Sequence, residues 1–173
     1  MGYLSDDRIG EGLLPFLSVK ENLTIINLKS IKKGLFISSF MEKKVAEKMI
    51  SSLKIITPSL SQRLAFLSGG NQQKVYIAKW LLAEASILIF HGPTIGVDVG
   101  TRRQIYYLIR SLAEEGKSII IVSYEAEEVY DICDRVEVLW KGLICKTVIP
   151  GETLFKDFIY YITHGSGGEN IVS

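Results

Sequence analysis

Residues 87–92 carry the first pattern that bears on chemistry, an apolar run followed directly by His91 and Gly92. Strands of a parallel sheet often end at a ligand site, and enzymes that cleave phosphates place carboxylates there to hold Mg²⁺ and orient water. Neutral imidazole is a poor ligand for Mg²⁺, which prefers oxygen, and glycine has no side chain to act as a base. The pattern favours a structural His91 over the alternative, a general base that would need a bound nucleotide and metal.

The second pattern is the run LSGGNQQK, residues 67–74, which opens a predicted helix. Gly69 and Gly70 let the backbone come close to a ligand, and the free amides of a helix N-terminus favour an anion. Ser68 adds a hydroxyl donor. The alternative is a capped helix start behind a flexible Ser-Gly-Gly hinge, and the residues alone leave the two interpretations equal.

Other candidate residues have simpler interpretations. Asp98 fits the N-cap of the helix that follows it. Gly116-Lys117-Ser118 imitates the end of a phosphate-binding loop, but it follows a helix and precedes a strand, so Gly116 is interpreted as a helix stop. Packing or surface positions are expected for three residues that can bind metals, His164, Cys133 and Cys145. No catalytic residue and no metal site is therefore expected.

The composition is that of an ordinary globular protein. The 173 residues are enough for one domain with a core, and 20 Lys and Arg against 19 Asp and Glu give a net charge of +1, which argues against a nucleic-acid partner. Two cysteines are too few for a disulfide framework and favour a reducing compartment. Because neither an apolar run of about 18 residues nor a signal peptide occurs, a soluble protein is expected.

The elements that position these residues alternate along the chain. The first 17 residues show no periodicity and predict a loop, while Ser18 and Glu21 form a capping box that predicts a helix start. Apolar residues every four positions predict an amphipathic helix over residues 39–55. The later elements are expected as a helix opened by LSGG, a strand at 86–90, a helix at 101–115, a strand at 118–123, a helix at 125–133, a hairpin of strands at 135–140 and 143–149, and a helix at 152–163. This order predicts an α/β fold, with a mostly parallel sheet that helices cover on both faces and a late antiparallel hairpin.

Several of these segments together resemble a known family, the ATP-binding subunits of ABC transporters. LSGGNQQK is similar to the family's signature motif, in the form found in the second half of tandem subunits from sugar and nucleoside importers of the ribose, galactose and xylose type. LSDDRIGEGL (residues 4–13) resembles another stretch of that half, with Asp6 where glutamate is usual. PTIGVDVGTRRQIYYLI (93–109) resembles the region of the D-loop, and DICDRVEVLWKG (131–142) the late hairpin.

The resemblance implies a P-loop NTPase fold that is incomplete in this chain. The family's Walker A motif, G-x-x-x-x-G-K-[ST], does not occur in the 173 residues. The chain is expected to begin just downstream of that loop, either as a truncated gene product or as an incomplete piece. The resemblance implies a partial ATPase domain over residues 1–163, with a helical, signature-bearing part at about 18–85, a sheet part at about 86–150 and the last helix at about 152–163. A disordered tail is expected at 164–173.

By the same resemblance, His91 stands in place of the Walker B aspartate that holds Mg²⁺, and Gly92 in place of the glutamate that orients water. Tyr124 stands at the switch position, where many members carry histidine. Asp98 belongs to the D-loop, which lies at the interface of paired domains. The residues implied to contact ATP held by the other domain, in trans, are Ser68, Gly69, Gly70 and Gln72.

The resemblance also implies cofactors and partners. ATP and Mg²⁺ are implied by the family only, and neither is expected on the isolated chain. The implied partners are a second ABC ATPase domain and a membrane permease, at the cytoplasmic face of the membrane. An incomplete sheet would leave an open edge and an uncovered apolar face, both open to self-association. Two functions stay open: a catalytically inactive part of an ATP-binding domain in carbohydrate or nucleoside uptake, or a non-enzymatic pseudo-ATPase fragment that only pairs with such partners.

Overall fold

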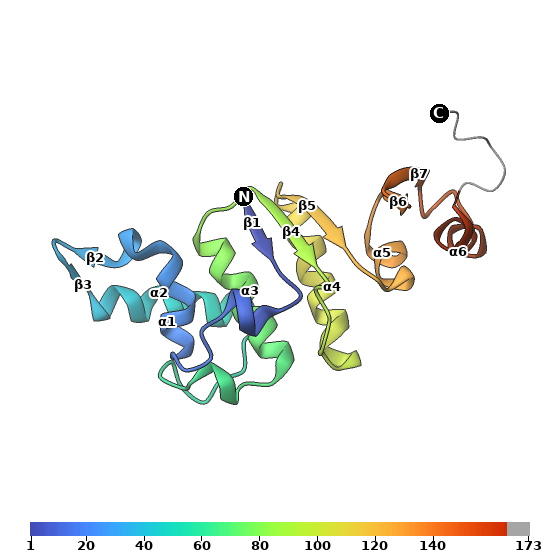
Figure 1. The fold of residues 1–173 in the computed structure, drawn as a ribbon. Coiled ribbons are helices and arrows are strands. Elements are labelled where there is room, and N and C mark those ends of the chain that lie inside the picture. Colours follow the sequence, from blue (N-terminus) through green and yellow to red (C-terminus); the bar gives the residue numbers. More distant parts are fainter. Residues whose placement is uncertain (166–173) are drawn as a thin grey trace. The chain divides into compact units, whose positions relative to one another are not determined.

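The computed structural model describes residues 1–165 and divides the chain into two compact units, Met1–Val122 and the part that begins at Ser123 (Figure 1). The first unit holds the signature segment, Asp98 and the strand that ends at His91. The second unit holds Tyr124 and the late hairpin.

A parallel sheet of three strands, in the order β1-β4-β5, forms one part of the first unit. The strands are β1 (Gly2–Leu4), β4 (Ile87–His91) and β5 (Ser118–Val122). The expected loop over the first 17 residues is therefore wrong at β1, in which Leu4 pairs with Phe90 of β4. Three residues are too short for an alternating pattern, so this strand is defined only by its partner. A π-helical turn, η1 (Arg8–Gly12), follows it.

Two helices pack on one face of this sheet, α3 (Gly69–Leu82) and α4 (Val99–Glu114) (Figure 1). That face carries Leu4, Leu88 and Phe90, which belong to the same buried core as the apolar stripes of the two helices. The opposite face leaves Ile120 and Val122 exposed. The prediction that helices cover both faces of the sheet is thus wrong for the described residues. The face that carries Ile120 and Val122 is apolar and uncovered.

The strand order gives the physical reason for the one-sided cover. Crossovers between parallel strands are right-handed. Because the order β1-β4-β5 advances in one direction without a reversal, the crossovers containing α3 and α4 lie on the same side of the sheet.

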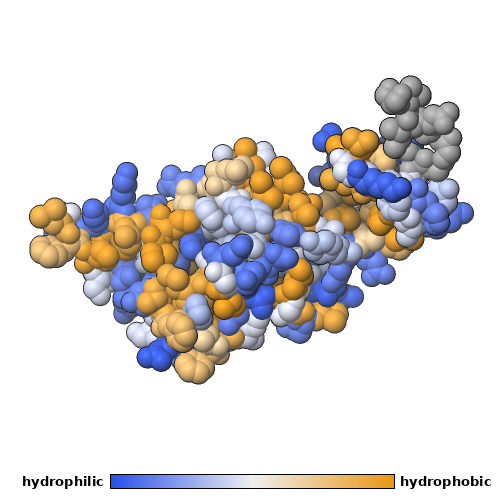
Figure 2. All heavy atoms as spheres, in the orientation of Figure 1, coloured by the Kyte–Doolittle hydropathy of each residue, from blue (hydrophilic) through white to orange (hydrophobic). Residues whose placement is uncertain are grey.

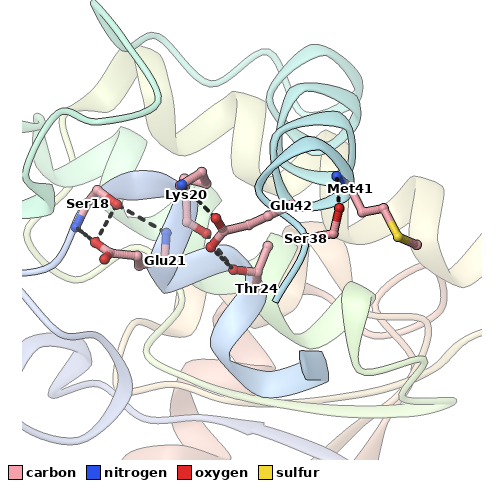
Figure 3. Close-up of polar contacts among 7 residues, drawn as sticks. All are labelled: Ser18, Lys20, Glu21, Thr24, Ser38, Met41 and Glu42. Carbon is pink, nitrogen blue, oxygen red and sulfur yellow. Dashed lines mark hydrogen bonds and ion pairs between the residues drawn. The ribbon is translucent and has the colours of Figure 1, made fainter. Parts of the chain in front are cut away.

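A helical part packs against α3 in the same unit. Its elements are α1 (Val19–Thr24), the 3-10 segment η2 (Ile25–Ile31), the short hairpin of β2 (Lys32–Lys33) and β3 (Phe36–Ile37), α2 (Ser39–Ser52) and the 3-10 turn η3 (Leu64–Phe66). The capping box at α1 is confirmed, since Glu21 N–H donates to Ser18 Oγ at 3.2 Å and Ser18 N–H donates to Glu21 Oε2 at 2.8 Å (Figure 3).

The second unit is built on the predicted hairpin, whose strands are β6 (Val136–Trp140) and β7 (Leu143–Val148). Lys141 and Gly142 both have positive φ, as a two-residue hairpin turn requires. The other elements are α5 (Ala126–Ile132) and α6 (Phe155–His164). Tyr130 of α5 stacks with Phe158 of α6, with ring centroids 5.6 Å apart. Of the tail expected at 164–173, His164 ends α6 and Gly165 caps it, and the remainder lies outside the described residues.

Candidate functional site

The signature segment forms the first turn of α3, with Ser68 as its N-cap. Ser68 is exposed, and its side chain does not cap the helix but accepts a hydrogen bond from Asn71 Nδ2 at 2.9 Å. Asn71 Oδ1 in turn accepts from the N–H of Ile56 at 2.7 Å. The first amides of a helix have no partner inside it, so α3 presents a hydroxyl and a positive dipole end at the surface.

Gly69 and Gly70 allow close packing between α3 and the segment that follows β4. A Cβ atom on Gly69 would lie 2.5 Å from the carbonyl oxygen of Gly96, and one on Gly70 would lie 2.3 Å from Thr101 Cγ2. Both distances are below any normal contact. The packing of this fold therefore requires glycine at both positions, whether or not the two glycines also approach a ligand.

Arg8, a residue that no local sequence pattern marks, joins the signature to the D-loop region. Its Nη1 donates to the carbonyl oxygen of Ile95 at 2.7 Å, and its Nε donates to Gln72 Oε1 at 3.4 Å. Burial lowers the pKa of Arg8 from its ordinary value. The only signal in the sequence was its place in the stretch LSDDRIGEGL, because nothing local predicts its distant partners.

Gln72 lies inside the unit and not at the exposed helix start. Its Oε1 accepts from Arg8, and its Nε2 donates to the carbonyl oxygen of Leu64 at 3.2 Å. Lys74, two residues on, is also buried, and it donates to the carbonyl oxygen of Lys54 at 3.1 Å and to Gln104 Oε1 at 2.9 Å. Desolvation lowers the pKa of Lys74. The polar residues of the first two turns of α3 thus fasten the helix to its surroundings.

The end of β4 brings together three polar side chains, one from β4, one from β1 and one from the segment after β1. His91 Nδ1 lies 3.3 Å from Tyr3 Oη and 3.4 Å from Asp6 Oδ1. Asp6 supplies a carboxylate beside this strand end. It comes from the segment after β1, and the sequence did not show that this segment lies beside the end of β4. Gly92 follows with φ of +56°, a conformation that favours glycine. The imidazole of His91 therefore contacts protein groups at this strand end, and its role stays a prediction.

A metal site of protein ligands is not formed in the part of the chain that the structure describes. Across residues 1–165, three or more His, Cys, Asp or Glu side chains do not gather in one place. The cysteines Cys133 and Cys145 both lie in the second unit and are not joined in a disulfide.

Asp98 is the N-cap of α4, as predicted, with its Oδ1 accepting from the N–H of Thr101 at 2.9 Å. Hydrogen bonds from Thr101 lower the pKa of Asp98 from its ordinary value, with the larger contribution from the side chain and the smaller from the backbone N–H. Tyr124 lies in the second unit, where its side chain is exposed. The first unit therefore contains the signature, Asp98 and the strand end at His91, and it packs the signature against residues 96 and 101 on either side of Asp98.

None of the described helices, from residue 1 to 165, has the length and apolar character needed to cross a bilayer.

No protein-family model matches the chain. Curated proteins do match it. A putative ribose/galactose/methyl galactoside import ATP-binding protein of Albidiferax ferrireducens is 45% identical over 145 residues, which are 83% of this chain and 29% of that protein.

Two further relatives match over almost the whole chain. A xylose import ATP-binding protein of Thermoanaerobacter pseudethanolicus is 42% identical over 165 residues, which are 95% of this chain and 32% of that protein. A ribose import ATP-binding protein of Halalkalibacterium halodurans is 38% identical over 165 residues, which are 95% of this chain and 33% of that protein. The chain thus spans about a third of the length of the curated relatives it matches.

Solved structures show the same fold at lower identity. The ATP-binding cassette MJ0796, in a dimeric post-hydrolysis state with ADP and Pi, superposes with a TM-score of 0.69 at 23% identity, covering 86% of this chain and 62% of that chain. An inward-facing putative metal-chelate type ABC transporter gives a TM-score of 0.75 at 18% identity, covering 94% of this chain and 63% of that chain. The α/β architecture is therefore that of an ABC ATPase cassette.

Proposed function

This chain is a relative of the ATP-binding proteins of sugar-importing ABC transporters, and from that relationship we propose that it serves sugar uptake as the signature-bearing part of such a protein. In this role α3 directs its N-terminus at the triphosphate of an ATP molecule that another ATPase domain holds. The chain supplies one side of a shared nucleotide site and does not itself cleave the nucleotide.

The observation that carries the proposal is the exposed start of α3. Ser68 is at the surface, and its hydroxyl is held by Asn71 next to helix amides that have no partner inside the helix. An anion that approaches this point meets N–H donors, a hydroxyl and the positive end of the helix dipole. The packing of Gly69 and Gly70 against residues 96 and 101 keeps this start in a defined position.

The end of β4 supports the non-catalytic part of the proposal. Mg²⁺ needs oxygen ligands, and the two positions after the apolar strand offer an imidazole and a glycine. The imidazole is already in contact with Tyr3 and Asp6. In this proposal, ATP and Mg²⁺ are therefore held by the partner domain, and a permease is the further partner at the membrane.

The test is capture of a complete, hydrolysis-deficient ATPase domain of a sugar importer, with and without ATP. We expect capture to be tighter with ATP and the gain to disappear for Ser68→Asp, whose carboxylate would face the phosphates. Ser68 is the position to change, because any side chain on Gly69 meets the Gly96 carbonyl and disturbs the fold itself. Ser61→Asp, at another exposed serine, is the matched control and should keep the gain. Equal capture with and without ATP would show that the motif is only a helix start here.

A further inference from the structure

A short projecting hairpin in the helical part of the first unit and the first turn of α2 beside it expose large apolar side chains. The exposed fractions are 91% for Leu35, 80% for Phe36, 51% for Ile37 and 77% for Phe40. We call these four residues the apolar tip. Figure 2 shows hydrophobic side chains gathered at the end of the unit that Figure 1 labels β2 and β3. Soluble proteins seldom leave such neighbouring apolar groups in water without a partner.

The apolar tip is surrounded in the sequence by exposed lysines. They lie just before it and in the first turns of α2, at Lys29, Lys32, Lys33, Lys43 and Lys44. The only acidic residue between residues 25 and 46 is Glu42. Glu42 is buried, with its Oε2 2.6 Å from Lys20 Nζ and its Oε1 accepting from Thr24 Oγ1 at 3.2 Å (Figure 3). One position beyond this range, the exposed Glu47 lies 3.8 Å from Lys43 and offsets that lysine. The other four lysines leave the surface near the tip with a net positive charge.

The hairpin is fastened at its base. Ile31 at one end is fully buried, and its carbonyl oxygen accepts from the N–H of Ser38 at 2.8 Å. Ser38 is also the N-cap of α2, with its Oγ accepting from Met41 N–H at 3.4 Å (Figure 3). The tip is therefore a built projection on an ordered support.

We propose that the apolar tip and its lysines dock on a bilayer that contains anionic lipids. Apolar side chains at the end of a convex projection can enter the boundary between headgroups and acyl chains. Lysines beside them keep their ammonium groups among the lipid phosphates, while their aliphatic stems lie along the apolar surface. A second copy of this chain is a poorer occupant, because four side chains are far fewer than the roughly 20–30 residues a stable protein interface uses on each side.

The test is flotation of the 173-residue chain with protein-free vesicles, either of phosphatidylcholine alone or with about a third of phosphatidylserine. We expect binding to the anionic vesicles at least about tenfold tighter than to the neutral ones, and weaker binding at high salt. Leu35→Ser with Phe36→Ser should weaken binding at least about tenfold. Phe66→Ser, at a phenylalanine that is 73% exposed outside the tip, is the matched control and should bind as the parent does.

The charge part of the proposal has its own pair of variants. Lys32→Gln with Lys33→Gln should weaken binding to anionic vesicles by about fivefold per lysine. Lys141→Gln with Lys156→Gln, which changes the net charge equally in the second unit, should leave binding unchanged. A Phe36→Trp variant should shift its emission to the blue and be quenched by brominated lipid, whereas Phe66→Trp should do neither.

Four results would overturn the proposal. Absence of binding to anionic vesicles would do so directly. Binding that survives the tip substitutions would place the contact elsewhere, such as on the uncovered face of the sheet. Binding that requires membrane proteins, or a concentration-dependent dimer lost with the tip and no lipid binding, would assign the tip to a protein partner.

Discussion

The carbonyl oxygen of Gly96 lies 2.5 Å from the point at which a Cβ atom of Gly69 would stand. Gly69 is in the first turn of α3 and Gly96 is in the loop after β4, so two segments widely separated in the sequence meet backbone to backbone. This contact joins the signature motif to the D-loop region, and Arg8 reinforces it from the N-terminal segment.

Gly69→Ala should destabilise the first unit. A backbone carbonyl cannot rotate away as a flexible side chain does, so the added methyl group must shift α3 or the loop, at a cost of about 1–3 kcal/mol. For a chain of this size that lowers Tm by several degrees. Thermal unfolding followed by circular dichroism measures it. Gly151→Ala, which meets nothing within 4 Å, is the control, and an equal Tm for both variants would contradict the packing argument.

Arg8→Met should lower the free energy of unfolding by about 1–2 kcal/mol while keeping much of the aliphatic stem. The loss arises because the Ile95 carbonyl and the Gln72 amide oxygen both lose a charged donor. Arg103→Met, on an exposed position of α4, is a control for the charge. Urea denaturation gives the two values, and a loss at Arg8 no larger than the loss at Arg103 would mean that the Arg8 contacts add no stability.

The capping box predicts a pH-dependent stability. Hydrogen bonds from Ser18 lower the pKa of Glu21 from its ordinary value of 4.5, with the larger contribution from the side chain and the smaller from the backbone. The unfolded chain then binds more protons than the folded one in the acid range, so this contribution is present above pH 4.5 and is lost as the pH falls through the folded-state pKa.

Ser18→Ala should therefore cost about 1 kcal/mol at pH 7 and less as the pH falls below 4.5. Ser38→Ala removes the cap of α2, which no carboxylate shares, so its cost should not depend on pH in this way. Urea denaturation from pH 7 to pH 3 tests both. A cost for Ser18→Ala that stays constant over this range would rule out the proposed linkage.

The purified chain should hydrolyse no ATP above background with Mg²⁺ or Mn²⁺, since the strand end carries His91 and Gly92 instead of two acids. Phosphate release over hours, measured beside a complete ATPase domain, gives the comparison. Turnover that vanishes in a His91→Ala variant would identify the imidazole as a base. Turnover unaffected by that change would point to a contaminating enzyme.

The sequence alone was enough for the local features of this protein. Ser18, Asp98 and the Lys141-Gly142 turn act through hydrogen bonds and dihedral angles within a few residues, so their positions follow from residue types at fixed spacing. The α/β order follows from hydrophobic periodicity, and the motif LSGGNQQK led to the same family as the relatives that match most of the chain.

Only the tertiary structure decided the contacts between distant segments. β1 exists through its pairing with β4, and the contacts of Asp6 with His91 and of Arg8 with Ile95 and Gln72 join residues that no local pattern relates. The one-sided cover of the sheet likewise depends on strand order, which periodicity does not contain. Such contacts form when the chain closes long loops and buries its apolar residues. The entropic cost of closing the loops is offset by apolar burial over the whole fold, so no single segment predicts the contacts.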